Sequence, residues 1–139
     1  MRLFLDSSAL IKRYIAERGT EQVVRFCREA EDIVLSVVCA PELISAFQRL
    51  RRERKLSTRQ YRALKKDLAA DLVQATIVQL TEAVLSRTVE TLEKTTVKTL
   101  DAIQVASAFE TSCDLLLSSD HRQCEAARRM GLNVDELPS

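Results

Sequence analysis

The sequence predicts an α/β domain built on a doubly wound parallel sheet, and two patterns support this prediction. Five short apolar runs of the β-prone kind are separated by longer segments whose apolar residues recur with helical spacing. The runs are continuous rather than alternating, which is typical of strands covered by helices on both faces. Such alternation favours right-handed βαβ units, and a length of 139 residues predicts a single domain over residues 1–139.

The predicted strands are residues 3–5, 33–35, 77–78, 115–117 and 132–134. A helix is expected over residues 42–55, where four apolar side chains form a stripe opposite the arginines: Leu43, Ile44, Phe47 and Leu50. The stretch Ser57-Thr58-Arg59-Gln60 has the pattern of a capping box, which predicts that a second helix opens there.

Two further helices precede the fourth predicted strand. Residues 81–94 carry Val84, Leu85, Val89 and Leu92 at helical spacing. Residues 100–109 are apolar on nearly every side, so we expect this helix to be deeply buried. Thr99 is the expected N-cap, which puts Asp101 at the second helical position, where an acid in an apolar helix is conspicuous.

The composition excludes several kinds of site. The chain has one histidine, His121, and four cysteines without a C-x-x-C pair, so a zinc site is not expected and the thiols are expected to be free and buried. The only glycines, Gly19 and Gly131, fit neither a dinucleotide-binding fingerprint nor a P-loop. The chain shows neither a signal peptide nor a membrane-spanning run, which predicts a cytoplasmic protein without membrane contact.

Charge is distributed unevenly along the chain. Residues 49–66 contain nine basic residues and one acid, Glu53, so this segment carries +8, whereas the whole chain carries +1. Such asymmetry is compatible with a polyanion partner, although solvated helix faces would account for it equally well.

Four acids lie at the points where helices are expected to begin: Asp6, Glu42, Asp101 and Asp120. Each alone could be a helix cap, because free N–H groups and the helix dipole favour negative charge there. In a parallel sheet, however, all strand-to-helix turns lie at one edge, and ligands bind where the strand order reverses. If the first and fourth strands are neighbours, the four carboxylates meet in one crevice.

Carboxylates gathered in one crevice repel one another unless a cation joins them. Oxygen ligands without histidine favour Mg²⁺ or Mn²⁺, which usually also bind phosphate oxygens. The acids therefore indicate metal-assisted hydrolysis of a phosphodiester, and the basic segment would contact nucleic-acid phosphates.

Four stretches of the chain resemble the acidic motifs of PIN-domain nucleases in order and spacing: "LFLDSSALIKRY", "SVVCAPELISAF", "LKTLDAIQVASA" and "LLLSSDHRQCEAARRMGLNV". The resemblance covers residues 2 to about 135. The length and the opening "DSSALIKRY" are most similar to VapC-type toxins of toxin–antitoxin systems.

The resemblance implies a three-layer α/β/α fold with five parallel strands in the order 3-2-1-4-5. It implies Mg²⁺- or Mn²⁺-dependent endoribonuclease activity on RNA, a homodimer and a VapB-like antitoxin. The candidate catalytic residues are the metal-binding acids Asp6, Glu42, Asp101 and Asp120, with the small polar residues Ser8 and Ser118. Ser118 stands where threonine is commoner in the family, and His121 matches no catalytic position.

Two alternatives remain open at this point. A phosphatase of the haloacid-dehalogenase type would use Asp6 as a nucleophile, but such an enzyme usually has a second aspartate where this chain has Ser8. A non-catalytic module of the same fold could bind RNA through residues 49–66, or bind an antitoxin, without cleaving anything.

Overall fold

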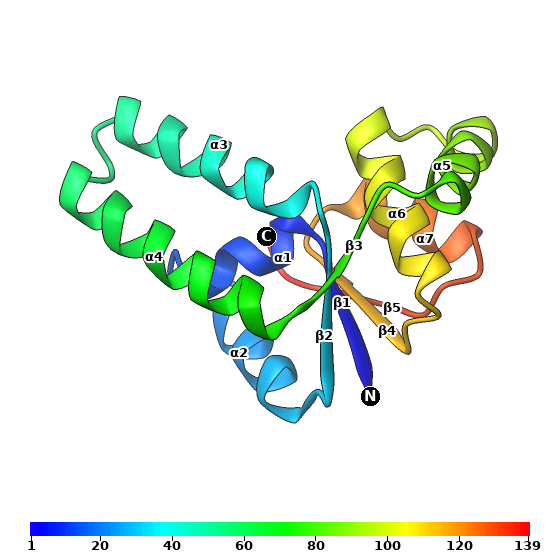
Figure 1. Cartoon of the computed structure of the whole chain (residues 1–139), viewed down its shortest axis with the longest axis horizontal. Helices are drawn as coiled ribbons and strands as arrows, with labels where there is room; N and C mark the ends of the chain where they lie inside the picture. Colours follow the sequence, from blue (N-terminus) through cyan, green and yellow to red (C-terminus); the bar gives the residue numbers. More distant parts are fainter.

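The computed structural model describes all 139 residues and is centred on a five-stranded parallel sheet in the order β3-β2-β1-β4-β5 (Figure 1). The strands are β1 (Arg2–Leu5), β2 (Asp32–Ser36), β3 (Thr76–Val78), β4 (Leu115–Ser118) and β5 (Val134–Glu136). The predicted order is therefore confirmed, including the pairing of β1 with β4 on one side and β2 on the other.

Helices cover both faces of this sheet. They are α1 (Ser7–Leu10), the 3₁₀ turn η1 (Ile11–Arg13), α2 (Thr20–Glu29), α3 (Cys39–Arg52), α4 (Thr58–Gln74), α5 (Glu82–Lys94), α6 (Thr99–Glu110) and α7 (His121–Arg129). Helices α1 to α4 pack over Leu3 and Leu5, whereas α6 and α7 pack over Phe4. Successive residues of β1 thus point into two different cores, as a strand covered on both faces requires. None of the helices combines the length and the apolar character needed to cross a membrane.

The last strand begins two residues later than the sequence pattern predicts. Gly131 adopts φ 91°, and the N–H group of Leu132 donates to the carbonyl of Ala127. Leu132 therefore belongs to the turn that ends α7 rather than to the sheet, because a left-handed residue directly after a helix folds the chain back onto its last carbonyls.

Helices α3 and α4 form a hairpin that extends away from the sheet (Figure 1). Helix α3 ends at Arg52, earlier than predicted, because Arg54 turns the chain with φ 59°. The predicted capping box then opens α4: the Ser57 hydroxyl accepts from the Gln60 N–H at 3.0 Å, and the Gln60 side chain accepts from the Ser57 N–H at 2.8 Å. Most of the basic segment consequently lies at and near the tip of this hairpin.

Helix α5 buries a different face from the one its apolar pattern indicates. Val84 is buried together with Thr88 and Thr91, whose hydroxyls donate at 2.8 Å to carbonyls one turn earlier in the helix. Because these hydroxyls are satisfied within the helix, the threonine methyl groups can pack against α6. Leu85 and Val89 remain exposed.

Contacts from α6 hold α5 in this orientation. The Arg87 guanidinium lies 4.0 Å from the ring centroid of Phe109 and pairs with Glu110 at 2.9 Å. A cation over an aromatic face and an ion pair at the same residue fix the rotation of α5 about its axis.

We expect Val84→Ala to lower the free energy of unfolding by about 2 kcal/mol, because it leaves a cavity between α5 and α6. The matched control is Val89→Ala on the same helix, which removes the same atoms from a side chain that is 55% exposed. We expect the control to change stability by less than about 0.5 kcal/mol. Urea unfolding of the two variants measures the difference, and equal losses would contradict the observed helix face.

Candidate functional site

All four predicted acids lie at the carboxyl edge of the sheet. Asp6 directly follows β1, and Asp120 follows the neighbouring strand β4 and precedes α7. Glu42 is in the first turn of α3 and Asp101 is in the first turn of α6. The edge between β1 and β4 is also where the strand order reverses, which is where open parallel sheets bind ligands.

Asp6 is both a helix cap and a buried charge. Its side chain caps α1, since Oδ1 accepts from the Ala9 N–H at 2.9 Å and from the Ser8 hydroxyl at 2.7 Å. Its backbone N–H donates to the Leu117 carbonyl of β4 at 3.2 Å. The second oxygen, Oδ2, has no hydrogen-bond partner although it is fully buried, in a residue that is only 1% exposed. Capping therefore accounts for one carboxylate oxygen and leaves the other unsatisfied.

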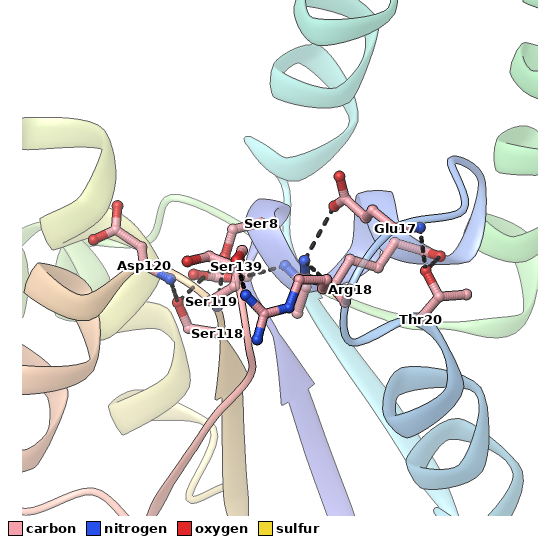
Figure 2. A network of polar contacts seen from close by, with 11 residues as sticks. Ser8, Glu17, Arg18, Thr20, Ser118, Ser119, Asp120 and Ser139 are labelled. Carbon is pink, nitrogen blue, oxygen red and sulfur yellow. Dashed lines mark hydrogen bonds and ion pairs between the residues drawn. The ribbon is translucent and has the colours of Figure 1, made fainter.

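The serines around Asp6 connect the ends of β1 and β4 (Figure 2). The Ser8 hydroxyl gives its proton to Asp6 and accepts from the Ser119 N–H at 2.9 Å. The Ser118 oxygen lies 3.3 Å from that of Ser8 and accepts from the Asp120 N–H at 3.0 Å. The two small polar residues thus link the backbones that carry Asp6 and Asp120.

Glu42 is held by two polar residues that the sequence analysis missed. The Ser7 hydroxyl donates to Glu42 Oε1 at 2.7 Å, and the Gln104 amide donates to the same oxygen at 2.8 Å. Gln104 lies within a run of seven buried residues in α6, one turn after Asp101. A long polar side chain inside the apolar stretch "AIQVASA" was the signal that could have drawn attention to it.

Asp101 is half-buried and accepts no hydrogen bond from the protein. The N-cap of α6 is Lys98 rather than Thr99, so the predicted cap is wrong and Asp101 lies at the third helical position. Lys98 makes no side-chain cap bond, and its extended backbone, rather than a capping side chain, marks the start of the helix. A capping role therefore does not explain Asp101.

The carboxylates perturb one another electrostatically. Burial raises the pKa of Asp6 to about 6, against the lowering effect of the Ser118 and Ser8 hydroxyls, and the charge of Asp120 adds to the rise. Burial also raises the pKa of Asp101, with the charges of Asp120 and Glu42 adding to it. The acids therefore lie within electrostatic reach of one another, in an arrangement that disfavours negative charge.

The four acids do not by themselves form a closed metal-binding site. No three histidine, cysteine, aspartate or glutamate side chains approach closely enough to enclose a metal ion. The donor set nevertheless fits a hard cation, because it consists of carboxylates only and includes the unpaired, buried Oδ2 of Asp6. Glu42 also lines a cleft of about 340 Å³ with Val38, Pro41, Ser45 and Leu100, so this side of the edge is open to solvent.

The remaining titratable candidates lie outside this arrangement. All four cysteines are free; Cys27, Cys39 and Cys124 are buried, whereas Cys113 is only partly so. Burial raises the pKa of the Cys39 thiol to about 12, so it is not a thiolate nucleophile. His121 is exposed, and its side chain contacts Glu136 at 3.1 Å rather than any of the four candidate acids.

The fold and the acid-lined edge define a known class of protein. Residues 3–129 match the sequence profile of the PIN domain, so the chain belongs to the PIN-domain family. This assignment removes the phosphatase alternative. No curated protein is significantly similar to the chain in sequence.

Solved structures with this fold include proteins described as toxins or toxin–antitoxin complexes, at low sequence identity. FitAcB from Neisseria gonorrhoeae superimposes with a TM-score of 0.71 at 17% identity, over 95% of each chain. VapBC2 from Rickettsia felis, solved bound to a fragment of promoter DNA, gives 0.71 at 11% identity, over 99% of each chain. VapC20 from Mycobacterium tuberculosis, described as a toxin that cleaves the sarcin–ricin loop, gives 0.67 at 15% identity over 89% of this chain and 94% of that one. At these identities the likeness establishes the fold.

The buried charge of Asp6 predicts an inverse pH dependence of stability. Because folding raises the pKa of Asp6 from 3.8 to about 6, the native state binds this proton more tightly than the unfolded chain. The contribution of Asp6 to stability therefore falls as pH rises from about 4 to about 6 and stays low above that. In EDTA at pH 8 we expect Asp6→Asn to be more stable than the wild type by about 1–2 kcal/mol, because the amide carries no charge but leaves its NH₂ group unpaired.

Thermal unfolding in EDTA between pH 4 and pH 8 measures this effect. The advantage of Asp6→Asn should shrink towards pH 4, where the native wild type is protonated at this site. A variant that is less stable than the wild type at pH 8 would contradict a buried, unpaired carboxylate and favour a purely capping role.

Proposed function

We propose that the chain is a Mg²⁺- or Mn²⁺-dependent endoribonuclease that acts as the toxin of a VapBC-type toxin–antitoxin system. The observation that carries the proposal is the buried, unpaired Oδ2 of Asp6 at the switch point of the sheet, within electrostatic reach of Asp120. An oxygen in this environment is unfavourable for the protein alone and favourable as a ligand for a cation.

Asp6, Glu42, Asp101 and Asp120 would hold the ion. Mg²⁺ keeps several waters and needs only one or two direct carboxylates, so acids that do not form a closed cage are compatible with it. When bound, the cation supplies a water of lowered pKa and Lewis acidity toward a phosphate oxygen, which is the chemistry of phosphodiester hydrolysis.

The serines orient the acids in this proposal. Ser8 donates to Oδ1 of Asp6 and so would leave Oδ2 available to the ion. Ser118 accepts from the backbone N–H of Asp120 and lies 3.3 Å from the Ser8 hydroxyl, which links the segments that carry the two aspartates. Neither hydroxyl is required to react.

The basic tip of the α3–α4 hairpin supports a nucleic-acid substrate. A shallow cavity of about 650 Å³ is lined there by Arg51, Arg52, Arg54 and Lys55, and no acid lines it. Arg52 lies ten residues beyond Glu42 along α3, which places it about 15 Å away along the helix axis. These cations would therefore contact backbone phosphates distant from the cleaved bond and add affinity without selecting sequence.

The expected partners are a VapB-like antitoxin and a second copy of the chain. Support comes from the structural relatives, because those from Rickettsia felis and Salmonella typhimurium are VapBC proteins solved bound to DNA. A short reading frame for an antitoxin beside the gene, and suppression of toxicity by its product, would test this role.

One observation favours a second candidate function, a PIN-fold module that binds RNA or an antitoxin without catalysis. No three acids stand close enough together to enclose an ion. Calorimetry with Mn²⁺ and with a single-stranded RNA separates the two candidates. RNA binding without any binding of Mn²⁺ would favour the module.

We expect Asp6→Asn and Asp101→Asn each to lower Mg²⁺-dependent RNA cleavage by at least about 100-fold, because each removes a charged ligand of the ion. The matched control is Asp67→Asn, the same chemical change at an exposed acid of α4. Single-turnover cleavage of a labelled RNA measures the rates. Wild-type rates in both site variants would refute the metal-centre proposal.

Replacing Arg52 and Arg54 together by alanine should weaken RNA binding and lower the dependence of log Kd on log salt concentration by about 1.4, since two phosphate contacts are lost. The cleavage rate at saturating RNA should not change, because these residues are remote from the acids. Removing Arg25 and Arg28, two exposed arginines of α2, is the control. An unchanged salt dependence in the hairpin variant would exclude this surface as an RNA contact.

A further inference from the structure

Ser7, Glu42 and Gln104 form a buried polar contact that joins three elements of the site. Ser7 is the residue directly after Asp6, and Gln104 lies one helical turn after Asp101. The Gln104 side chain reaches the Ser7 hydroxyl at 3.0 Å and Glu42 Oε1 at 2.8 Å. Glu42 is therefore linked through one oxygen to the segments that carry two of the other acids.

The direction of these hydrogen bonds follows from the chemistry of the groups. A carboxylate only accepts, so the single proton of the Ser7 hydroxyl, 2.7 Å away, is directed at Glu42 Oε1. The Gln104 NH₂ group then donates to both neighbours, since the opposite amide orientation would place its oxygen against the carboxylate. Both donors converge on Oε1, and the protein supplies no hydrogen bond to Oε2.

Core stability does not account for the amide at this position. Gln104 is 1% exposed, and its carbonyl oxygen Oε1 is buried without a partner. An unpaired buried acceptor destabilises the folded state, and leucine, of similar size, would avoid that cost. What the amide provides instead is a donor to Glu42.

We propose that Ser7 and Gln104 are positioning residues that occupy Oε1 of Glu42, so that Glu42 offers only Oε2 to the divalent cation. The inference rests on the proposed metal-dependent function and specifies how one acid takes part in it. With one oxygen occupied and the side chain held in place, Glu42 would bind the cation through a single oxygen.

The test compares Gln104→Leu and Ser7→Ala with the wild type. Both variants should bind Mn²⁺ about tenfold more weakly in calorimetry, because the partners that orient a ligand typically contribute at this level. Gln104→Leu should unfold at the same temperature as the metal-free wild type, or higher, because it removes an unpaired buried oxygen. Ser7→Thr, which keeps the hydroxyl, should restore Mn²⁺ affinity.

The chain offers a matched control in Ser107, on the same helix. Its hydroxyl is also buried, but it has no hydrogen-bond partner and does not contact the acids. Ser107→Ala should leave both Mn²⁺ affinity and cleavage unchanged. In Gln104→Leu, raising the Mn²⁺ concentration should bring cleavage back towards the wild-type rate, which a general structural defect would not allow.

The outcomes separate this inference from the proposed function. A wild type that binds Mn²⁺, with Gln104→Leu and Ser7→Ala that bind it equally well, would overturn the positioning role alone. A wild type that binds no Mn²⁺ would overturn the metal-dependent function and the positioning role together. If Gln104→Leu fails to fold, Ser7→Ala and Ser7→Thr still decide the question, since they remove and restore one of the two donors.

Discussion

The burial of one charged carboxylate, that of Asp6, is the constraint on which the rest of the sheet edge depends. Water cannot solvate this group, and its pKa rises to about 6 as a result. The surrounding polar contacts reduce the free-energy cost of burying this charge but do not remove it. Ser8 and the Ala9 N–H donate to one oxygen and leave the other unpaired. The cap and the candidate ligand are therefore the same side chain, used through two different oxygens.

The distribution of charge across the molecule follows from the same architecture. The four acids of the site lie where strands end and helices begin. The arginines and lysines of residues 49–66 lie in the part of the α3–α4 hairpin that is farther from the sheet. Helix α3 connects the two regions, since Glu42 is in its first turn and Arg52 is its last residue, so a polyanion could be held at one region and presented to the other. The near-neutral net charge of +1 conceals this separation.

The parallel sheet could be predicted from the sequence, because short apolar runs alternate with segments of helical periodicity, whereas the strand order followed from the resemblance to PIN domains. The sequence pattern failed where a local interaction overrode hydrophobicity. The hydroxyls of Thr88 and Thr91 donate to carbonyls within α5, so these residues can occupy its buried face, where the pattern predicts Leu85 and Val89. Leu132 donates to a carbonyl of α7 and ends that helix instead of joining the sheet. With that strand order assumed, the four acids could be placed at one edge of the sheet. The partners of Glu42 could not, because the contact between Ser7 and Gln104 spans 97 positions of the chain.

The central position of β1 has a consequence for motion at the site. This strand is paired on both sides, and the Asp6 N–H continues the ladder to β4, so the backbone that carries Asp6 cannot open locally without separating the middle of the sheet. Glu42 and Asp101, by contrast, lie in the first turns of α3 and α6, which pack against the sheet. Conformational freedom at this edge is thus coupled: strand pairing holds the β1 and β4 side in place, and the contacts of Glu42 with Ser7 and Gln104 join α3 and α6 to it.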